Sequence, residues 1–90
     1  MLKTLEELIA IVRQRKESSV EESYTYKLLK NKKLSIEKVK EEIAELIEAI
    51  EKNTNKVHEA ADILYHLMVF LEANDIKIED VMDELKKRQK

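Results

Sequence analysis

The fold is decided by residues 36–73, which read IEKVKEEIAELIEAIEKNTNKVHEAADILYHLMVFLEA. Apolar residues recur every three or four positions in both halves, which is typical of amphipathic helices. Asn53-Thr54-Asn55 separates the halves and is the clearest turn in the chain, because asparagine tolerates left-handed backbone conformations. We expect one helix from about Ile36 to Lys52 and a second from about Val57 to Ala73, running antiparallel.

The caps and the burial of these two helices follow from their residue types. Ser35 is the expected N-cap of the first helix, and Thr54 or Asn55 of the second. The second helix is apolar nearly all round, so we expect it to be buried on most sides. In a chain of 90 residues, this predicts a contact with a second subunit as well as an internal core.

Three further helices are expected outside this stretch. They run from about Leu2 to Lys16, Tyr24 to Lys30 and Ile78 to Lys87, and Ser23 is a suitable N-cap for the second of them. A polar loop at Glu17–Glu22 and a basic break at Asn31–Lys33 separate the earlier helices. The sequence thus predicts a single all-α domain over residues 1–90, a bundle of four to five helices built around the antiparallel pair and assembling as an oligomer.

Composition excludes several functional classes. The chain has no Gly, Pro, Cys or Trp, and its formal net charge is −2. Without glycine there is no phosphate-cradling loop or dinucleotide fingerprint, and without cysteine there is no thiolate metal site. The slightly acidic balance argues against a nucleic-acid partner, and the apolar runs are far shorter than the roughly 20 residues of a membrane span. A cytoplasmic protein is expected.

Four acidic residues are candidates for chemistry. Glu42 and Glu45 share one face of the first helix of the pair, and Glu59 and Asp62 share one face of the second. In an antiparallel hairpin Glu45 falls near the level of Asp62, so the four carboxylates converge. Their mutual repulsion would raise their pKa values, and a divalent cation, best Mg²⁺ or Mn²⁺, would remove this penalty. This predicts a Mg²⁺-dependent enzyme acting on a phosphorylated substrate.

Simpler explanations stay open for each candidate. Acidic pairs three residues apart are common on charged helices that bind no metal. Glu41 is either a base near the site or a solvated residue, and the basic run from Lys27 to Lys33 either holds phosphate or is solvated. His66 fits a partly buried histidine better than a ligand. The tyrosines fit packing better than catalysis; they are Tyr24, Tyr26 and Tyr65.

Several segments resemble a known family. They are Ser23–Leu29 (SYTYKLL), Lys38–Glu45 (KVKEEIAE), Glu59–Leu67 (EAADILYHL) and Ile78–Leu85 (IEDVMDEL). Together they resemble phosphoribosyl-ATP pyrophosphohydrolases, which belong to the all-α MazG-type nucleotide pyrophosphohydrolases. The resemblance covers nearly the whole chain in order. The paired acidic motifs mark only the superfamily, whereas the first and third segments single out this family.

The resemblance implies the second step of histidine biosynthesis, in which phosphoribosyl-ATP is hydrolysed to phosphoribosyl-AMP and pyrophosphate with Mg²⁺. It also implies a homodimer or a larger homo-oligomer. It assigns metal binding to four acids, which are Glu42, Glu45, Glu59 and Asp62. It makes Glu41 the residue that orients or deprotonates the attacking water, and it makes Lys27 and Lys38 the phosphate-binding lysines.

The chain departs from the family at positions where glycine is usual. Lys40 precedes the Glu41-Glu42 pair, Lys30–Leu34 follows the second helix, and Asp75 and Lys77 precede the last helix. These changes put loop geometry in doubt more than activity. Because the chain lacks the metal-binding cysteines of the cyclohydrolase domain to which this enzyme is often fused, the stand-alone form is expected.

Two other functions remain alternatives. One is a house-cleaning hydrolase of non-canonical nucleoside triphosphates, which would share the metal site and differ in substrate. The other is a non-enzymatic helical interaction module whose acidic residues are solvated.

Overall fold

The computed structural model describes residues 2–17 and 23–89, and these form five α-helices and no strand. This confirms the predicted all-α class. The predicted ends of four helices agree with the structure to within one residue; the loop expected at Glu17–Glu22 lies outside the described residues except for Glu17, which is helical. The helices are α1 (Lys3–Glu17), α2 (Tyr24–Lys30), α3 (Lys32–Lys52), α4 (Lys56–Ala73) and α5 (Ile78–Arg88).

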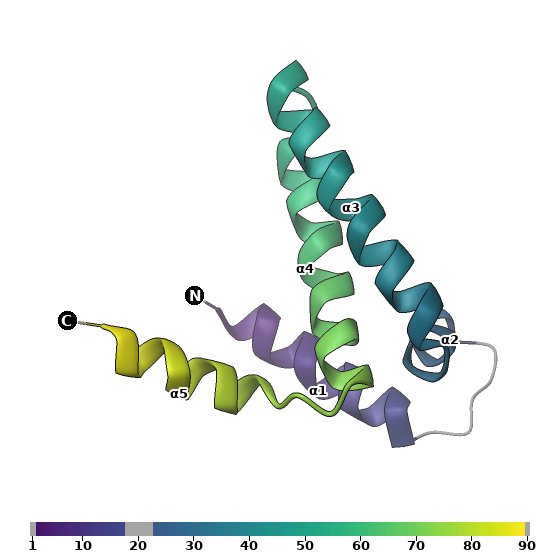
Figure 1. The fold of residues 1–90 in the computed structure, drawn as a ribbon, viewed down its shortest axis with the longest axis vertical. Coiled ribbons are helices and arrows are strands. Elements are labelled where there is room, and N and C mark those ends of the chain that lie inside the picture. Colours follow the sequence, from purple (N-terminus) through teal and green to yellow (C-terminus); the bar gives the residue numbers. More distant parts are fainter. Residues whose placement is uncertain (1, 18–22, 90) are drawn as a thin grey trace.

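The two longest helices, α3 and α4, form the predicted antiparallel hairpin (Figure 1). Asn53 ends α3 in the left-handed conformation (φ 56°), and its N–H donates to the carbonyls of Ala49 and Ile50. The Thr54 N–H donates to the Ala49 carbonyl over 2.9 Å, which satisfies the end of the helix. Asn55 occupies the N-cap position of α4, also left-handed, but its side chain makes no capping hydrogen bond.

The start of α3 differs from the prediction. Ser35 does not cap this helix: it lies inside α3 and is buried. Asn31 is the cap instead, because its side-chain oxygen accepts from the Leu34 N–H (3.0 Å) while its own N–H donates to the Lys27 carbonyl. The expected break at Asn31–Lys33 therefore shrinks to one residue. The cap predicted at Ser23 is confirmed, since its hydroxyl accepts from the Tyr26 N–H at 3.4 Å.

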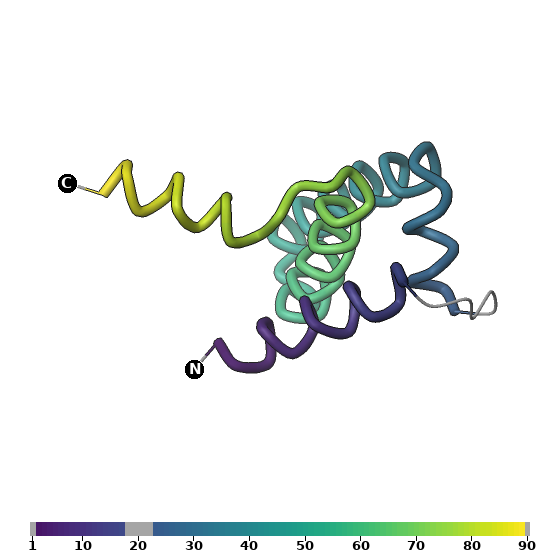
Figure 2. The backbone as a smooth tube through the Cα atoms, turned by 90° about the horizontal axis from the view of Figure 1, so that it is seen from below, coloured from purple at the N-terminus to yellow at the C-terminus, as the bar shows by residue number. Residues whose placement is uncertain are grey.

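The core lies at the base of the hairpin, which is the end opposite its turn. There α1 and α2 pack against the second half of α4 (Figure 2). Its buried members are Val12, Leu28, Leu29, Val69 and Ala73, with Leu8, Leu34 and Tyr65 packed around them. Polar contacts tie α1 to the end of α4 and the start of α5. Arg13 pairs with Glu72 and Glu79, and Lys16 donates to Asp75 and to the Glu72 carbonyl.

The half of the hairpin next to its turn is not covered by any of the described residues. Val57 of α4 is 85% exposed and Leu64 of the same helix is 46% exposed, so the expected burial of α4 holds only toward its C-terminal end. The radius of gyration is 14.2 Å, against about 12 Å for a compact chain of this length. Figure 1 shows the cause, because α5 projects away from the hairpin. None of the helices in the described ranges has the length and apolarity needed to span a bilayer.

The core predicts a contrast between two leucines. Leu28 is fully buried, so Leu28→Ala should lower the free energy of unfolding by about 3 kcal/mol through lost burial and the cavity left behind. Leu2→Ala makes the same chemical change at a side chain that is 66% exposed, and should cost less than about 0.5 kcal/mol. Urea unfolding at one fixed protein concentration measures both. Similar losses in the two variants would contradict the placement of the core.

Candidate metal centre

Acidic side chains from α3 and α4 converge on one side of the hairpin. One oxygen each from Glu42, Glu45 and Glu59 lies within 4.8 Å of the others. Asp62 belongs to a second group, in which its carboxylate, that of Glu59 and the His58 imidazole meet the same limit. All four acids predicted from the sequence thus lie on this face, but as two groups that share Glu59.

His58 is a member that the sequence analysis missed. Its Nε2 lies 3.3 Å from Oδ2 of Asp62, one turn along α4, although its side chain is largely exposed. The sequence could have indicated it, because His58 and Asp62 are four residues apart and so lie on the same face of the helix.

Burial makes this cluster unusual among surface acids. Glu42 is only 9% exposed, and Glu42 Oε2 and Glu59 Oε2 have no hydrogen-bond partner among the described residues. Burial raises the pKa of Glu42 to about 7, and the neighbouring Glu45, Asp62 and Glu59 carboxylates add to this effect. The pKa of Glu59 is also raised, by burial first and then by Glu45. Unpaired buried oxygens that repel one another fit a divalent cation, which would supply the missing partner.

His66 of α4 lies beside Glu42. It is 7% exposed, and its Nε2 lies 3.8 Å from Oε1 of Glu42. Burial is the main cause that lowers the pKa of His66, so the neutral imidazole is favoured. A neutral His66 gives the Glu42 carboxylate no compensating charge. The sequence predicted a partly buried histidine, and in the structure His66 is almost fully buried.

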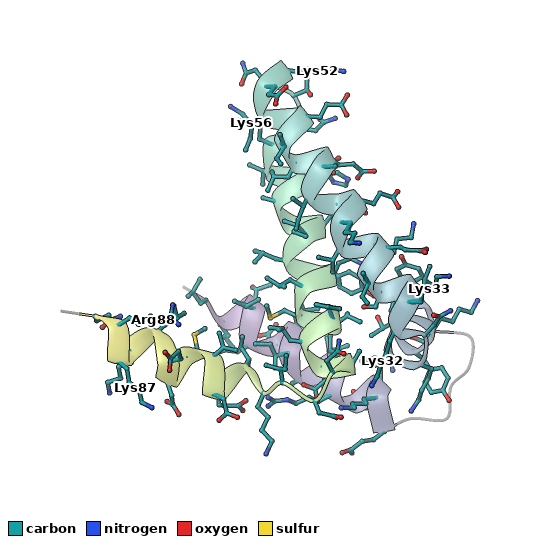
Figure 3. All side chains as sticks on the ribbon, in the orientation of Figure 1. Lys32, Lys33, Lys52, Lys56, Lys87 and Arg88 are labelled. Carbon is teal, nitrogen blue, oxygen red and sulfur yellow. The ribbon has the colours of Figure 1, made fainter. Side chains whose placement is uncertain are left out.

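The other predicted residues lie outside the cluster. Glu41 is half-exposed, and its Oε2 accepts from Lys38 Nζ at 3.3 Å, which raises the pKa of Lys38. Lys27 is exposed on α2 and, within the described part of the chain, makes no ion pair with the cluster. Figure 3 shows further lysines on the hairpin: Lys52 of α3 and Lys56 of α4 lie at its tip, and Lys32 and Lys33 lie at the start of α3.

Fold and site together define an all-α protein with an acid-lined helical hairpin. The chain belongs to the phosphoribosyl-ATP pyrophosphohydrolase family, whose model matches residues 5–89.

Curated relatives agree with this family. A histidine biosynthesis bifunctional protein of Pyrococcus furiosus is 47% identical over 90 residues, which are 99% of this chain and 43% of that protein. A phosphoribosyl-ATP pyrophosphatase of Methanococcoides burtonii is 39% identical over 93 residues, covering 98% of this chain and 94% of the relative. A phosphoribosyl-ATP pyrophosphatase of Clostridium novyi is 41% identical over 90 residues, covering 96% of this chain and 81% of the relative. The chain thus spans less than half of the bifunctional relative and most of the other two.

The raised pKa of Glu42 predicts a pH-dependent stability in the absence of metal. Because its pKa in the folded protein is about 7 against an ordinary 4.5, Glu42 stabilises the fold below pH 4.5, and this contribution is lost as pH rises through 7. Urea unfolding in a chelator should therefore show stability falling from pH 5 to pH 8. Glu42→Gln should flatten this fall, because the amide does not ionise.

Glu48→Gln is the matched control. Glu48 lies exposed on the same helix, and its pKa is lowered by Lys52 instead. Its substitution should leave the wild-type fall between pH 5 and pH 8 in place. Equal slopes for wild type and Glu42→Gln would show that Glu42 is not protonated in this range.

Proposed function

We propose that this protein is a cytoplasmic enzyme that hydrolyses phosphoribosyl-ATP to phosphoribosyl-AMP and pyrophosphate, the second step of histidine biosynthesis. Family membership over residues 5–89 and the activity named for the relatives support the substrate. The observation that carries the chemistry is the half-buried cluster of Glu42, Glu45 and Glu59, in which two buried carboxylate oxygens have no hydrogen-bond partner among the described residues. Such a cluster suits a reaction on a polyphosphate, which brings cations with it.

We assign the binding of Mg²⁺, or of Mn²⁺ in its place, to Glu42, Glu45, Glu59 and Asp62. The donors are all carboxylate oxygens, which both ions prefer. When bound, the metal would offset the charge of the triphosphate oxygens. The retained waters that these ions favour leave room for a substrate phosphate beside the protein ligands.

Glu41 and Lys38 lie next to this cluster and can act on water and phosphate. Glu41 would accept a proton as the water oxygen bonds to the α-phosphorus and the α–β anhydride bond breaks, so that pyrophosphate leaves. Lys38 is cationic near neutral pH, Glu41 raises its pKa further, and its ammonium can donate to a substrate phosphate. Lys27, exposed on α2, is a second candidate for the remaining phosphates.

Pyrophosphate release is the direct test of the reaction. The wild-type protein should release pyrophosphate from phosphoribosyl-ATP with Mg²⁺ and lose this activity in a chelator. Phosphoribosyl-AMP should be the other product. A house-cleaning hydrolase would instead prefer dUTP, dCTP or inosine triphosphate, so the same assay with these nucleotides separates the two functions. Preference for any of the three over phosphoribosyl-ATP would overturn the proposed substrate.

Alanine variants test the ligand assignment. Each substitution at Glu42, Glu45, Glu59 or Asp62 should lower kcat by more than about 100-fold, because loss of residues that only support metal ligands already costs 10- to 100-fold. The variants should stay folded, since removing one acid relieves repulsion. Glu48→Ala, on the exposed side of α3, should keep wild-type activity. A ligand variant with near wild-type turnover would remove that residue from the site.

A thermal melt separates the enzyme from an interaction module with solvated acids. Binding of Mg²⁺ to the folded state alone should stabilise the wild type, by about 2.7 kcal/mol at 100 times the dissociation constant. The ligand variants should lose this gain. A wild-type melt that does not respond to Mg²⁺ would favour the interaction module.

We also propose that the protein forms a homodimer or a larger homo-oligomer. Large apolar side chains stay exposed on the outer half of the hairpin; they are Ile43, Ile47 and Ile50 of α3 with Val57 and Leu64 of α4. The spacing of three, four and seven residues puts those of each helix on one face, and exposed apolar surface of this kind typically marks a protein interface. The open shape, with a radius of gyration of 14.2 Å, also supports a partner.

Substitution of one isoleucine tests this assembly. Ile47 is half-exposed in the middle of the apolar surface, so Ile47→Lys should shift the protein to monomers in light scattering coupled to gel filtration. Glu37→Lys adds a lysine at an exposed position of the same helix outside this surface and should leave the assembly unchanged. A wild-type protein that is monomeric at micromolar concentration would contradict the proposal.

A further inference from the structure

Tyr24 presents a half-exposed aromatic ring close to the acidic cluster. It is the first residue of α2, directly after the Ser23 cap, and is 47% exposed. The sequence analysis treated it as a packing residue. The exposed part of the ring offers an apolar aromatic surface to a ligand.

The ring is held in place from one side. It stacks on Tyr65 of α4 with centroids 6.4 Å apart and planes 16° apart, and it meets the edge of His66 at 6.0 Å and 87°. Tyr65 is itself fixed, since its hydroxyl shares a hydrogen bond with Thr25. One face of Tyr24 is therefore supported by Tyr65, and the exposed part of the ring faces solvent in a fixed orientation.

His66 links this ring to the acidic cluster. The same imidazole that meets Tyr24 lies 3.8 Å from Glu42 through its Nε2. Lys38 is also close, because its charge acts on the pKa of Tyr24 against the raising effect of burial. The acidic cluster, one imidazole and the aromatic ring thus follow one another along the same side of the hairpin. In a nucleotide, a single ribose ring separates the α-phosphate from the base, so a phosphate at the acidic cluster would leave the base near Tyr24.

We propose that Tyr24 stacks on the purine ring of the nucleotide substrate and so determines base binding, which rests on the function proposed above. A purine on the outer face of Tyr24 would extend the stack that Tyr65 begins. Stacking of a base on an aromatic side chain is tolerant of base identity and contributes substantially to binding. Because Tyr65 and His66 already fix the ring, little side-chain entropy is lost when the base binds.

Kinetics of three variants test this role. Tyr24→Ala should raise KM for phosphoribosyl-ATP about 10-fold with little change in kcat, since the ring contributes binding and not chemistry. Tyr24→Phe keeps the ring without the hydroxyl and should restore KM to within about twofold of wild type. Tyr26→Ala is the control: Tyr26 lies on the same helix, but its ring faces Lys30 Nζ (5.4 Å), and KM should not change.

Inhibition by inorganic triphosphate distinguishes stacking from a structural role. This inhibitor has phosphates but no base, so its inhibition constant should be the same for wild type and Tyr24→Ala. If Tyr24 only supports the fold or a subunit contact, Tyr24→Ala would weaken inhibition as much as it raises KM. That result, or an unchanged KM in an active protein, would overturn the inference. A wild type that releases no pyrophosphate would instead overturn the proposed function.

A fluorescent reporter gives a readout independent of activity. The chain has no tryptophan, so Tyr24→Trp introduces a single indole at this position. AMP should quench its emission, whereas ribose 5-phosphate, which lacks the base, should not. Equal effects of the two ligands, or no quenching by AMP at concentrations that inhibit the enzyme, would show that no base stacks here.

Discussion

Glu42 and Glu59 each place a carboxylate oxygen inside the α3–α4 hairpin with no described hydrogen-bond partner. Burial of such groups is unfavourable, and it raises the pKa of Glu42 to about 7. The apolar core and this unfavourable acidic cluster share no residue. Stability comes from apolar residues around Leu28 and Val69, while the mutually repelling acids lie nearer the turn that joins α3 to α4. Because the two regions are separate, repulsion among the acids does not disturb the packing of the apolar core.

The hairpin has two long sides with different chemistry. One carries the acidic cluster, His66 and Tyr24; the other leaves Ile43, Ile47 and Leu64 exposed. Within the described residues, α1 and α2 cover only the base of the hairpin, so the apolar side chains nearer its turn stay exposed. Assembly with a second copy would bury the apolar side and leave the acidic side open to a nucleotide.

The absence of glycine has less effect than the family comparison suggests. Of the departures, Lys40 lies inside α3, and the Lys30–Leu34 segment contains a single non-helical residue, Asn31, with φ −119°. Neither requires glycine. Asp75 does occupy a left-handed position (φ 59°), as Asn53 and Asn55 do in the hairpin turn. Asparagine and aspartate are the residues that tolerate this conformation best after glycine, so the turns keep their geometry.

Periodicity and turn chemistry in the sequence determined the helices, the antiparallel pair and the face that holds the four acids, because these depend on neighbours within one or two turns. Only the tertiary structure decided how far those acids are buried, that Glu59 joins two groups and that His58 belongs to one of them. It also decided that Asn31 rather than Ser35 caps α3, since Ser35 is buried inside the helix and Asn31 accepts from the Leu34 N–H. Burial and pKa depend on what other helices bring to a residue, and Tyr24 meets Tyr65 and His66 only through the packing of α2 on α4.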